Sequence, residues 1–303
     1  MTERPAGRPW EVHLALAAAQ VGFALFPIFG KLALSSIPPF VFAAFRVTAA
    51  ALVLEAIRRA QGDEPIRPED RRKVFLYGLL GVSFNQVLFI FGLFLTTAIN
   101  TTILTATIPV FTLAAAAVLG RERITLRGAA GIALAGAGAL ALLNAQRFDL
   151  SSDHFRGDLL LLLNCISYSL YLVLSRPLLA RYRVTTFTAA VFRYGAVFIV
   201  LIALPDLRRF EHQRVSVLAW ACLAAVILFC TVIPYLLNSW ALARTHASQV
   251  AFYVFLQPLI STALAIVVLD EILTSRTVLA GLLIGAGLAT SVLGRRLPAR
   301  PLP

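Results

Sequence analysis

Apolar runs about as long as a bilayer is thick dominate this chain and decide what it can fold into. Two of them, "GDLLLLLNCISYSLYLVLS" (157–175) and "VSVLAWACLAAVILFCTVIPYLLNSWAL" (215–242), contain at most one charged residue. A helix needs about 20 predominantly apolar residues to cross a hydrocarbon core about 30 Å thick. The whole chain is 59% hydrophobic and 14% charged, whereas soluble domains average about 45–50% and about 25%. The sequence therefore predicts an integral membrane protein.

The net charge of +12 does not indicate nucleic-acid binding, because the basic residues lie between the apolar runs. Membrane insertion itself selects cationic loops. Cys165, Cys222 and Cys230 lie inside apolar runs without metal-ligand spacing, so we expect small buried side chains, no metal and no cofactor. The apolar run after the basic N-terminus is too long for a cleaved signal peptide, and we expect it to form the first helix.

Turn-rich or charged segments divide the chain into ten expected helices. Clear boundaries are "SSIPP" (35–39) and "RRAQGDEPIRPEDRRK" (58–73), while the uncharged "LTTAIN" (95–100) fits either a tight turn or a flaw within a helix. With ten helices both termini share one side, where 18 Lys and Arg residues gather against six on the other side. Both termini should therefore face the cytoplasm. The expected helices cover 12–34, 39–60, 74–95, 98–119, 127–144, 157–176, 186–204, 217–241, 246–269 and 275–294.

The chain repeats itself after 149 residues. Residues 92–143 aligned with 241–292 give 14 identities in 52 positions, and a weaker match at slightly smaller offsets links the regions before them. Because five is an odd number, two five-helix units must be inserted upside down relative to each other. Inverted repeats recur in secondary transporters, with the substrate site at the bilayer midplane between them. The two matches pair Pro109 with Pro258, Glu122 with Glu271, Gly136 with Gly285, Gly138 with Gly287, Lys31 with Arg176 and Arg46 with Arg193.

These residues also carry a family resemblance. The proline-containing helix, the following "LGRERIT" or "LDEILT", and then "GIALAGAGALAL" or "GLLIGAGLATSVL" look like the paired EamA domains of the drug/metabolite transporter superfamily. The resemblance covers nearly the whole chain, with domains expected at 12–144 and 157–294 and cytoplasmic tails at 1–11 and 295–303. It implies ten helices in a bacterial inner membrane and export or exchange of small metabolites. Amino-acid exporters, including exporters of aromatic amino acids, are the family members to compare with this chain first. The chain lacks the membrane-embedded glutamate of the four-helix multidrug relatives, so drug–proton antiport of that type is not implied.

Polar side chains at mid-depth in the expected helices define a candidate substrate cavity. Such groups are costly in lipid and normally face a cavity or another helix. Asn164, Ser167, Tyr168 and Tyr171 recur at i, i+3, i+4 and i+7, on one face of one helix. The alternative is ordinary interhelical hydrogen bonding, which we favour for Ser167. The expected substrate-binding residues are Asn85, Gln86, Asn164, Tyr168, Tyr171, Tyr235, Tyr253 and Gln257.

Prolines and charged residues in the expected helices suggest hinges and gates. Pro109 and Pro258 each leave a backbone carbonyl without its helical partner, and we expect paired hinges rather than packing kinks. No acidic residue lies at mid-depth, with Glu55 the deepest, which favours transport driven by the substrate gradient without tight proton coupling. Two inverted clusters are expected as alternating gates, with snorkelling as the alternative. They are Lys31, Arg46 and Glu271 toward the outer side, and Arg176, Arg193 and Glu122 toward the cytoplasmic side.

The sequence thus predicts an all-α integral membrane bundle of ten transmembrane helices in two inverted five-helix repeats around a central cavity. The expected function is secondary transport of small amphiphilic metabolites, above all amino acids, by a monomer or weak homo-oligomer that contacts membrane lipid. A sugar-nucleotide or lipid-linked sugar carrier is the closest alternative, but only Arg46 and Arg193 are deep enough to bind phosphates. A membrane enzyme is less expected, since the four histidines are scattered and no HExxH or GxSxG motif occurs.

Overall fold

The computed structural model describes residues 9–121, 125–143, 152–245 and 247–292. These residues are almost entirely helical, and no strand occurs among them. The prediction of an all-α integral membrane protein is confirmed, because 8 of the described helices are long and apolar enough to cross a membrane. Two further apolar helices, α7 (Leu126–Leu143) and α14 (Ser275–Val292), are shorter in their described apolar parts. The candidate spans are Trp10–Leu34, Pro39–Ala60, Pro68–Leu95, Ala98–Val118, Asp153–Arg181, Val184–Arg209, Val217–Leu242 and Gln249–Leu269.

The helices lie close to their expected positions, but several extend into charged sequence. α1 (Pro9–Leu34) and α2 (Pro39–Ala60) differ little from expectation. α3 (Pro68–Gly78) begins at Pro68 rather than near residue 74, because proline suits the first helical position and the acidic Glu69 and Asp70 suit the first turn. α8 (Asp153–Arg181) and α9 (Val184–Arg209) also run several residues beyond the expected boundaries. Charged residues expected in loops therefore lie in helix ends.

The uncharged segment at 95–100 is a tight turn. α4 (Asn85–Leu95) ends at Leu95, and α5 (Ala98–Thr105) begins three residues later. Thr97 caps α5, since its hydroxyl oxygen accepts from the Asn100 backbone N–H at 3.0 Å. The short 3-10 helix η3 (His212–Arg214) lies between α9 and α10.

Four of the spans are interrupted partway along their length. Two contain a π-helical turn, one contains a 3-10 turn and one contains a short break at residues 106–107. Irregular turns inside helices are frequent at functional sites. The interrupted spans are α3, η1 (Leu79–Phe84) and α4; α5 and α6 (Ile108–Val118); α10 (Val217–Ile227), η4 (Leu228–Val232) and α11 (Ile233–Leu242); and α12 (Ala247–Phe252), η5 (Tyr253–Phe255) and α13 (Leu256–Leu269).

The two halves of the chain place these elements at matching positions. α3, η1, α5 and α7 begin 149 residues before α10, η4, α12 and α14, respectively, and α2 begins 145 residues before α9. These are offsets at which the sequence matches itself. The irregular turns are therefore a shared feature of both halves and not an isolated flaw of one helix.

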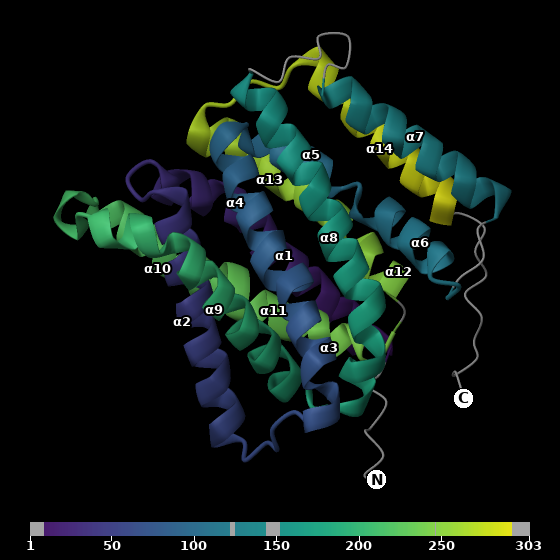
Figure 1. Ribbon diagram of the computed structural model, residues 1–303. Helices are drawn as coiled ribbons and strands as arrows, with labels where there is room; N and C mark the ends of the chain where they lie inside the picture. The colour runs from purple at the N-terminus through teal and green to yellow at the C-terminus, as the bar shows by residue number, and fades with distance from the viewer. Residues whose placement is uncertain (1–8, 122–124, 144–151, 246, 293–303) are drawn as a thin grey trace.

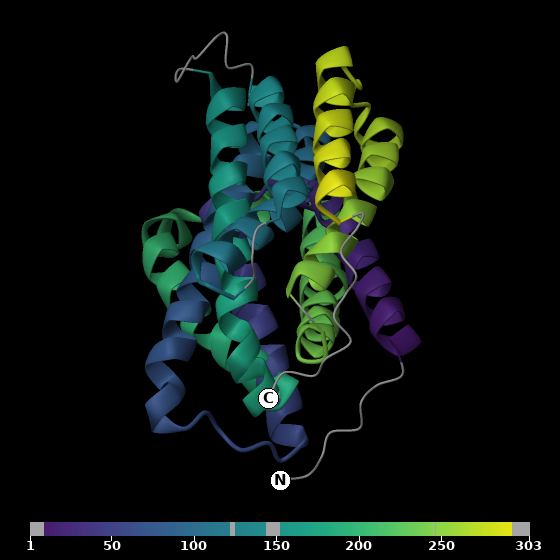
Figure 2. The ribbon, with the colours of Figure 1, turned by 90° about the vertical axis from the view of Figure 1, so that its right-hand side faces the viewer.

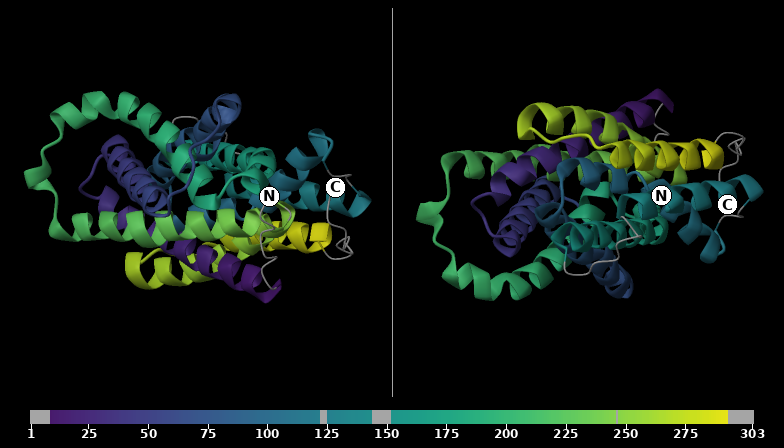
Figure 3. Two further views of the ribbon diagram at one scale, coloured as in Figure 1. Left: turned by 90° about the horizontal axis from the view of Figure 1, so that it is seen from below. Right: turned by 90° about the horizontal axis from the view of Figure 1, so that it is seen from above.

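The first helix of each half packs against the other half. α1 lies along α10, α11 and α13, while α8 lies along α4, α5 and α6. Figure 3 shows the purple α1 beside the green span of α10 and α11. At one edge of the bundle α7 and α14 run side by side (Figures 1 and 2). This exchange of helices means that both halves contribute side chains to the interior.

Candidate functional site

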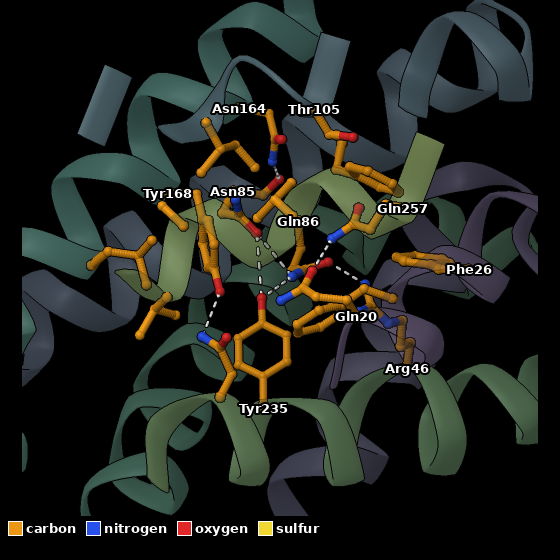
Figure 4. A pocket seen from close by; sticks show the side chains of 18 residues that line it. Gln20, Phe26, Arg46, Asn85, Gln86, Thr105, Asn164, Tyr168, Tyr235 and Gln257 are labelled. Atoms are coloured by element: carbon orange, nitrogen blue, oxygen red, sulfur yellow. Dashed lines mark hydrogen bonds between the residues drawn. The ribbon is translucent and has the colours of Figure 1, made fainter. Parts of the chain in front are cut away.

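A cavity of about 60 Å³ lies between the two halves, beside the four helix interruptions. It has room for a few water molecules, since about 10–15 Å³ of such space holds one. Figure 4 shows its side chains converging from helices of both halves. Its polar lining residues are Gln20, Arg46, Asn85, Gln86, Thr105, Asn164, Tyr168, Tyr235, Asn238 and Gln257, and its aromatic rings include Phe23, Phe26 and Phe89.

Hydrogen bonds link α2, α4 and α11 across this cavity. The Arg46 side chain is 1% exposed and donates through Nη1 to the side-chain oxygen of Gln86. Gln86 Nε2 in turn donates to the Tyr235 hydroxyl at 2.7 Å and to Asn85 Oδ1 at 2.9 Å (Figure 4). Because Arg46 fixes the oxygen of this amide, its hydrogens are directed to the far side. The cavity centre is thus a connected polar network, and not a set of independent side chains.

The π turns place two members of this network. Gln86 and Tyr235 lie 149 residues apart and follow η1 and η4, so their hydrogen bond joins equivalent positions of the two halves. A π turn leaves backbone carbonyls that need other donors in lipid. Ser83 Oγ lies 3.5 Å from the Gly78 carbonyl, five residues earlier, and Thr231 Oγ1 donates to the Val226 carbonyl, also five residues earlier, at 2.7 Å. Thr231 also accepts from Arg46 Nε at 2.8 Å, so the turn orients the guanidinium.

The remaining amide side chains of the cavity are also held by protein partners. Fixed amides form a pre-organised site because they need no rearrangement before a ligand binds. The bonds run from Asn164 Nδ2 to the Asn85 carbonyl at 2.7 Å, from Asn238 Nδ2 to the Tyr168 hydroxyl at 3.1 Å and from Gln257 Nε2 to Gln20 Oε1 at 2.6 Å.

Two of the eight expected substrate-binding residues lie outside the cavity. Tyr171 stacks on Tyr168 with ring centroids 5.9 Å apart, behind the lining. Tyr253 lines a separate apolar groove, and its hydroxyl is hydrogen-bonded to His13 Nδ1. Gln20 lines the cavity although the sequence analysis missed it, and its signal was a single amide inside the apolar run of α1. The six expected residues that do line the cavity are Asn85, Gln86, Asn164, Tyr168, Tyr235 and Gln257.

The family model of the EamA-like transporters matches the chain twice, over residues 10–144 and 155–293. The chain belongs to the EamA-like transporter family. This confirms the resemblance found in the sequence, and the EamA-like protein is accordingly a membrane transporter.

Similar proteins span most of the same length. An uncharacterized transporter of Archaeoglobus fulgidus is 27% identical over 289 residues, which cover 91% of this chain and 96% of the relative. YetK of Bacillus subtilis, also described as an uncharacterized transporter, is 25% identical over 264 residues, which cover 86% of this chain and 79% of YetK. A solved crystal structure matches with a TM-score of 0.69 at 22% identity, over 96% of this chain and 100% of the other. At that identity the crystal structure supports the fold alone.

Both expected hinge prolines of this EamA-like transporter follow a helix interruption. Pro109 is the second residue of α6, just after the break at 106–107, and Pro258 is the third residue of α13, just after η5. Around the first break the hydroxyls of Thr105 and Thr107 donate to carbonyls of their own helix at 2.8 and 2.7 Å. After the second, the Ser261 hydroxyl donates to a carbonyl of α1. Side-chain hydroxyls thus add donors to backbone carbonyls around both interruptions.

At one end of the bundle, Lys31 and Glu271 contact the turn between α4 and α5. Lys31 Nζ donates to the Thr96 carbonyl. The Glu271 carboxylate accepts from the first two backbone N–H groups of α5 at 2.7 and 2.9 Å, where the helix dipole favours negative charge. Asp158, in the second turn of α8, is 3% exposed and accepts from the Thr96 hydroxyl at 2.7 Å. The sequence analysis placed this carboxylate at a helix end and missed its burial.

Near the other end of α8, Arg176 makes the equivalent contact. Its Nε donates to the Thr245 carbonyl at 2.9 Å. Thr245 lies 149 residues after Thr96, and Arg176 lies 145 residues after Lys31. Both halves therefore bind a cation of their first helix to a carbonyl in the turn before α5 or α12.

The other expected gate residues lie elsewhere. Arg46 lines the cavity, whereas Arg193 is exposed on α9, with its guanidinium 5.4 Å from the centroid of the Tyr194 ring. The offset of 145 between the starts of α2 and α9 aligns Arg46 with the buried Val191 rather than with Arg193. Glu122 lies outside the described residues.

Proposed function

We propose that this EamA-like protein is a secondary transporter, an exporter or exchanger, that moves small amphiphilic metabolites across the plasma membrane by alternating access. Amino acids are the first substrate class to test. The observation that supports the proposal most is the buried polar cavity beside four helix interruptions, because transporters build midplane substrate sites from discontinuous helices. Its amides and hydroxyls suit the polar part of a substrate, and Phe23, Phe26 and Phe89 suit the apolar part.

The proposal includes two inverted units of five membrane helices, at 12–144 and 157–294, with tails at 1–11 and 295–303. α7 and α14 complete the units: each has 18 residues, which rise about 27 Å at about 1.5 Å per residue, close to the thickness of the hydrocarbon core. The matching positions of helices and irregular turns in the two halves support the repeat. The excess of basic residues on one side supports cytoplasmic termini in a bacterial inner membrane.

Single cysteines test this orientation, since the three native cysteines are buried. Glu64 lies between α2 and α3, and Glu211 lies between α9 and α10. In intact cells a membrane-impermeant thiol reagent should label Glu211→Cys and spare Glu64→Cys. The reverse pattern would overturn the orientation.

The two end contacts are the proposed gates. Lys31 and Glu271 close one end through the turn before α5, while Arg176 closes the other through the turn before α12. Glu122 keeps a proposed role as the sequence equivalent of Glu271. Because the two contacts are equivalent, opening one while the other stays closed gives the two states that alternating access needs.

We also propose that the substrate gradient drives transport without tight proton coupling. Among the described residues, no Asp, Glu or His lines the cavity, and these are the side chains that build proton relays in membrane proteins. In proteoliposomes with a fixed substrate gradient, flux should not change when a pH gradient is imposed. A flux that requires the pH gradient would contradict this mechanism and would direct attention to Asp158.

Counterflow in proteoliposomes tests the function itself. Vesicles that contain the wild-type protein and are loaded with one unlabelled amino acid should accumulate the same amino acid in labelled form. Equally loaded vesicles that contain the Gln86→Leu variant should accumulate it more slowly, because this variant breaks the cavity network. Arg209→Gln is the matched control, because Arg209 is exposed at the end of α9 and does not line the cavity. Counterflow of nucleotide sugars but of no amino acid would favour the sugar-carrier alternative, and counterflow of neither would contradict both.

A further inference from the structure

Arg46 is a buried cation that faces the cavity without a carboxylate partner. Its Nε and Nη1 donate to the neutral side chains of Thr231 and Gln86, and the guanidinium lies 4.1 Å from the centroid of the Phe26 ring. Among the described residues no ion pair includes Arg46, and no hydrogen bond from its Nη2 occurs. One edge of the guanidinium is therefore left for a ligand.

Two other buried charges of this protein are ion-paired, whereas the buried Asp158 is hydrogen-bonded to the neutral Thr96 and Asn100. The carboxylate of Asp63 pairs with Arg183, and that of Asp70 pairs with Arg181 at 3.0 Å. Burying an unpaired charge is costly, because the lost hydration is not replaced. Ionisable groups retained inside a membrane protein are by default functional. The unpaired guanidinium of Arg46 indicates that its counter-charge arrives with the substrate.

The hydrogen-bond partners of Arg46 leave its positive charge unbalanced. Gln86 turns its oxygen toward Arg46 and gives its amide hydrogens to Tyr235 and Asn85. The Tyr235 hydroxyl accepts from Gln86, and it lies 3.5 Å from two acceptors of its own, the Gly81 carbonyl and Asn85 Oδ1. Among the described residues that line the cavity, Arg46 therefore supplies a positive charge and no carboxylate balances it. Such an arrangement stabilises anionic oxygen through charge-assisted hydrogen bonds.

We propose that the substrate of this cavity is a small organic anion whose carboxylate binds Arg46 and whose apolar part contacts Phe23, Phe26 and Phe89. The inference rests on the proposed transport function and narrows its substrate class. One guanidinium balances one negative charge, so monocarboxylates bind more tightly than zwitterionic amino acids of the same skeleton, whose ammonium group meets no carboxylate in the cavity lining. A diphosphate would bring a second negative charge that the cavity does not pair.

Ligand stabilisation of the purified full chain in detergent tests this inference separately from transport. The probes are 3-phenylpropionate, L-phenylalanine, 3-phenylpropanamide and 3-phenylpropylamine, which share a skeleton and are an anion, a zwitterion, a neutral molecule and a cation. A second series of butyrate, 2-aminobutyrate, butyramide and butylamine removes dependence on the ring. In each series the anion should raise the unfolding temperature most. It should bind about tenfold to 100-fold more tightly than the amide, as a hydrogen bond to a charged group implies.

Variants locate the effect. Arg46→Gln should abolish the difference between anion and amide, and Arg46→Lys should keep part of it. Arg209→Gln, at the exposed end of the adjacent helix α9, is the matched control and should bind like the wild type.

The wild-type series decides the question even if Arg46→Gln does not fold. Equal stabilisation by anion and amide, or stronger stabilisation by the zwitterion or the amine, would overturn the inference. Anion preference in detergent without counterflow in proteoliposomes would remove the transport proposal and leave the anion site. Counterflow without anion preference would remove the anion site and leave the transport proposal.

Discussion

The glycines where α7 and α14 cross test how closely these helices approach. A Cβ added at Gly287 would lie 2.6 Å from the Gly131 carbonyl oxygen and 2.7 Å from the Ala135 backbone nitrogen. Backbone atoms cannot move aside by a rotamer change, so the helices would have to separate. Gly285, two residues earlier on α14, has space, since its added Cβ would find its nearest neighbour 3.9 Å away on the Phe255 ring.

Alanine should therefore have opposite effects at these two glycines. Gly287→Ala should lower the free energy of unfolding by about 1–3 kcal/mol, the usual cost of overpacking. Gly285→Ala should raise it by up to about 1 kcal/mol through better helix propensity. The difference between the variants, roughly 1–4 kcal/mol, corresponds to about 2–8 °C in the unfolding midpoint at about 2 °C per kcal/mol.

Thermal unfolding of the purified variants in one detergent measures this difference, and the other half of the chain supplies controls. Gly138→Ala should resemble Gly287→Ala, because its Cβ would lie 2.8 Å from the Ala280 carbonyl oxygen. Gly136→Ala should resemble Gly285→Ala, since no atom lies within 4 Å of its added Cβ. Equal midpoints for the crowded and the open positions would refute the close crossing of these helices.

Three further predictions concern transport and the network that supports it. Pro109→Ala restores a helical hydrogen bond at the break before α6, so stability should not fall while the counterflow rate does; a wild-type rate would make the break a packing kink. Glu271→Gln removes the charge that stabilises the first turn of α5, typically by about 0.3–1 kcal/mol, and should change the exchange rate; normal transport would remove this residue from the gate. A double-mutant cycle of Gln86→Leu and Tyr235→Phe, followed by unfolding in detergent, should give a coupling energy of about 0.6–1.7 kcal/mol. Additive effects would show that the two side chains do not depend on each other.

Hydrophobicity and proline placement were sufficient to predict the helices and two of their four interruptions. Lipid makes the apolar length of a span nearly obligatory, and a proline cannot complete the helix before it, so both features are local. The π turns η1 and η4 left no comparable signal, because a turn that is one residue wider keeps the same apolar composition. Tyr171 illustrates the consequence: its helix face was predicted, but its ring packs on Gly81, where an added Cβ would lie 2.4 Å from it, and not in the cavity.

The position of a residue within its helix did not predict where the end of a long charged side chain lies. Arg46 was assigned to the outer gate from its position near the start of a helix, yet its guanidinium lies in the cavity against Gln86. Its shared "FR" dipeptide suggested Arg193 as an equivalent, but the helix starts align it with Val191. Sequence matches in apolar helices cannot fix a register of two residues. The position of these arginines depends on packing between α2 and α9, which no single segment encodes.

The hydrogen bond between Gln86 and Tyr235 has a consequence for how such a protein can be assembled. The bond needs an amide on one side and a phenol on the other, at the same position of the two halves. An assembly of two copies of one half would bring glutamine to glutamine or tyrosine to tyrosine, and would supply either two Arg46 guanidiniums or two Val191 side chains. In one fused polypeptide the two halves can carry different side chains at equivalent positions. The first half supplies the Arg46 charge, and the second half supplies the Tyr235 ring. Neither half alone, paired with itself, could reproduce this cavity.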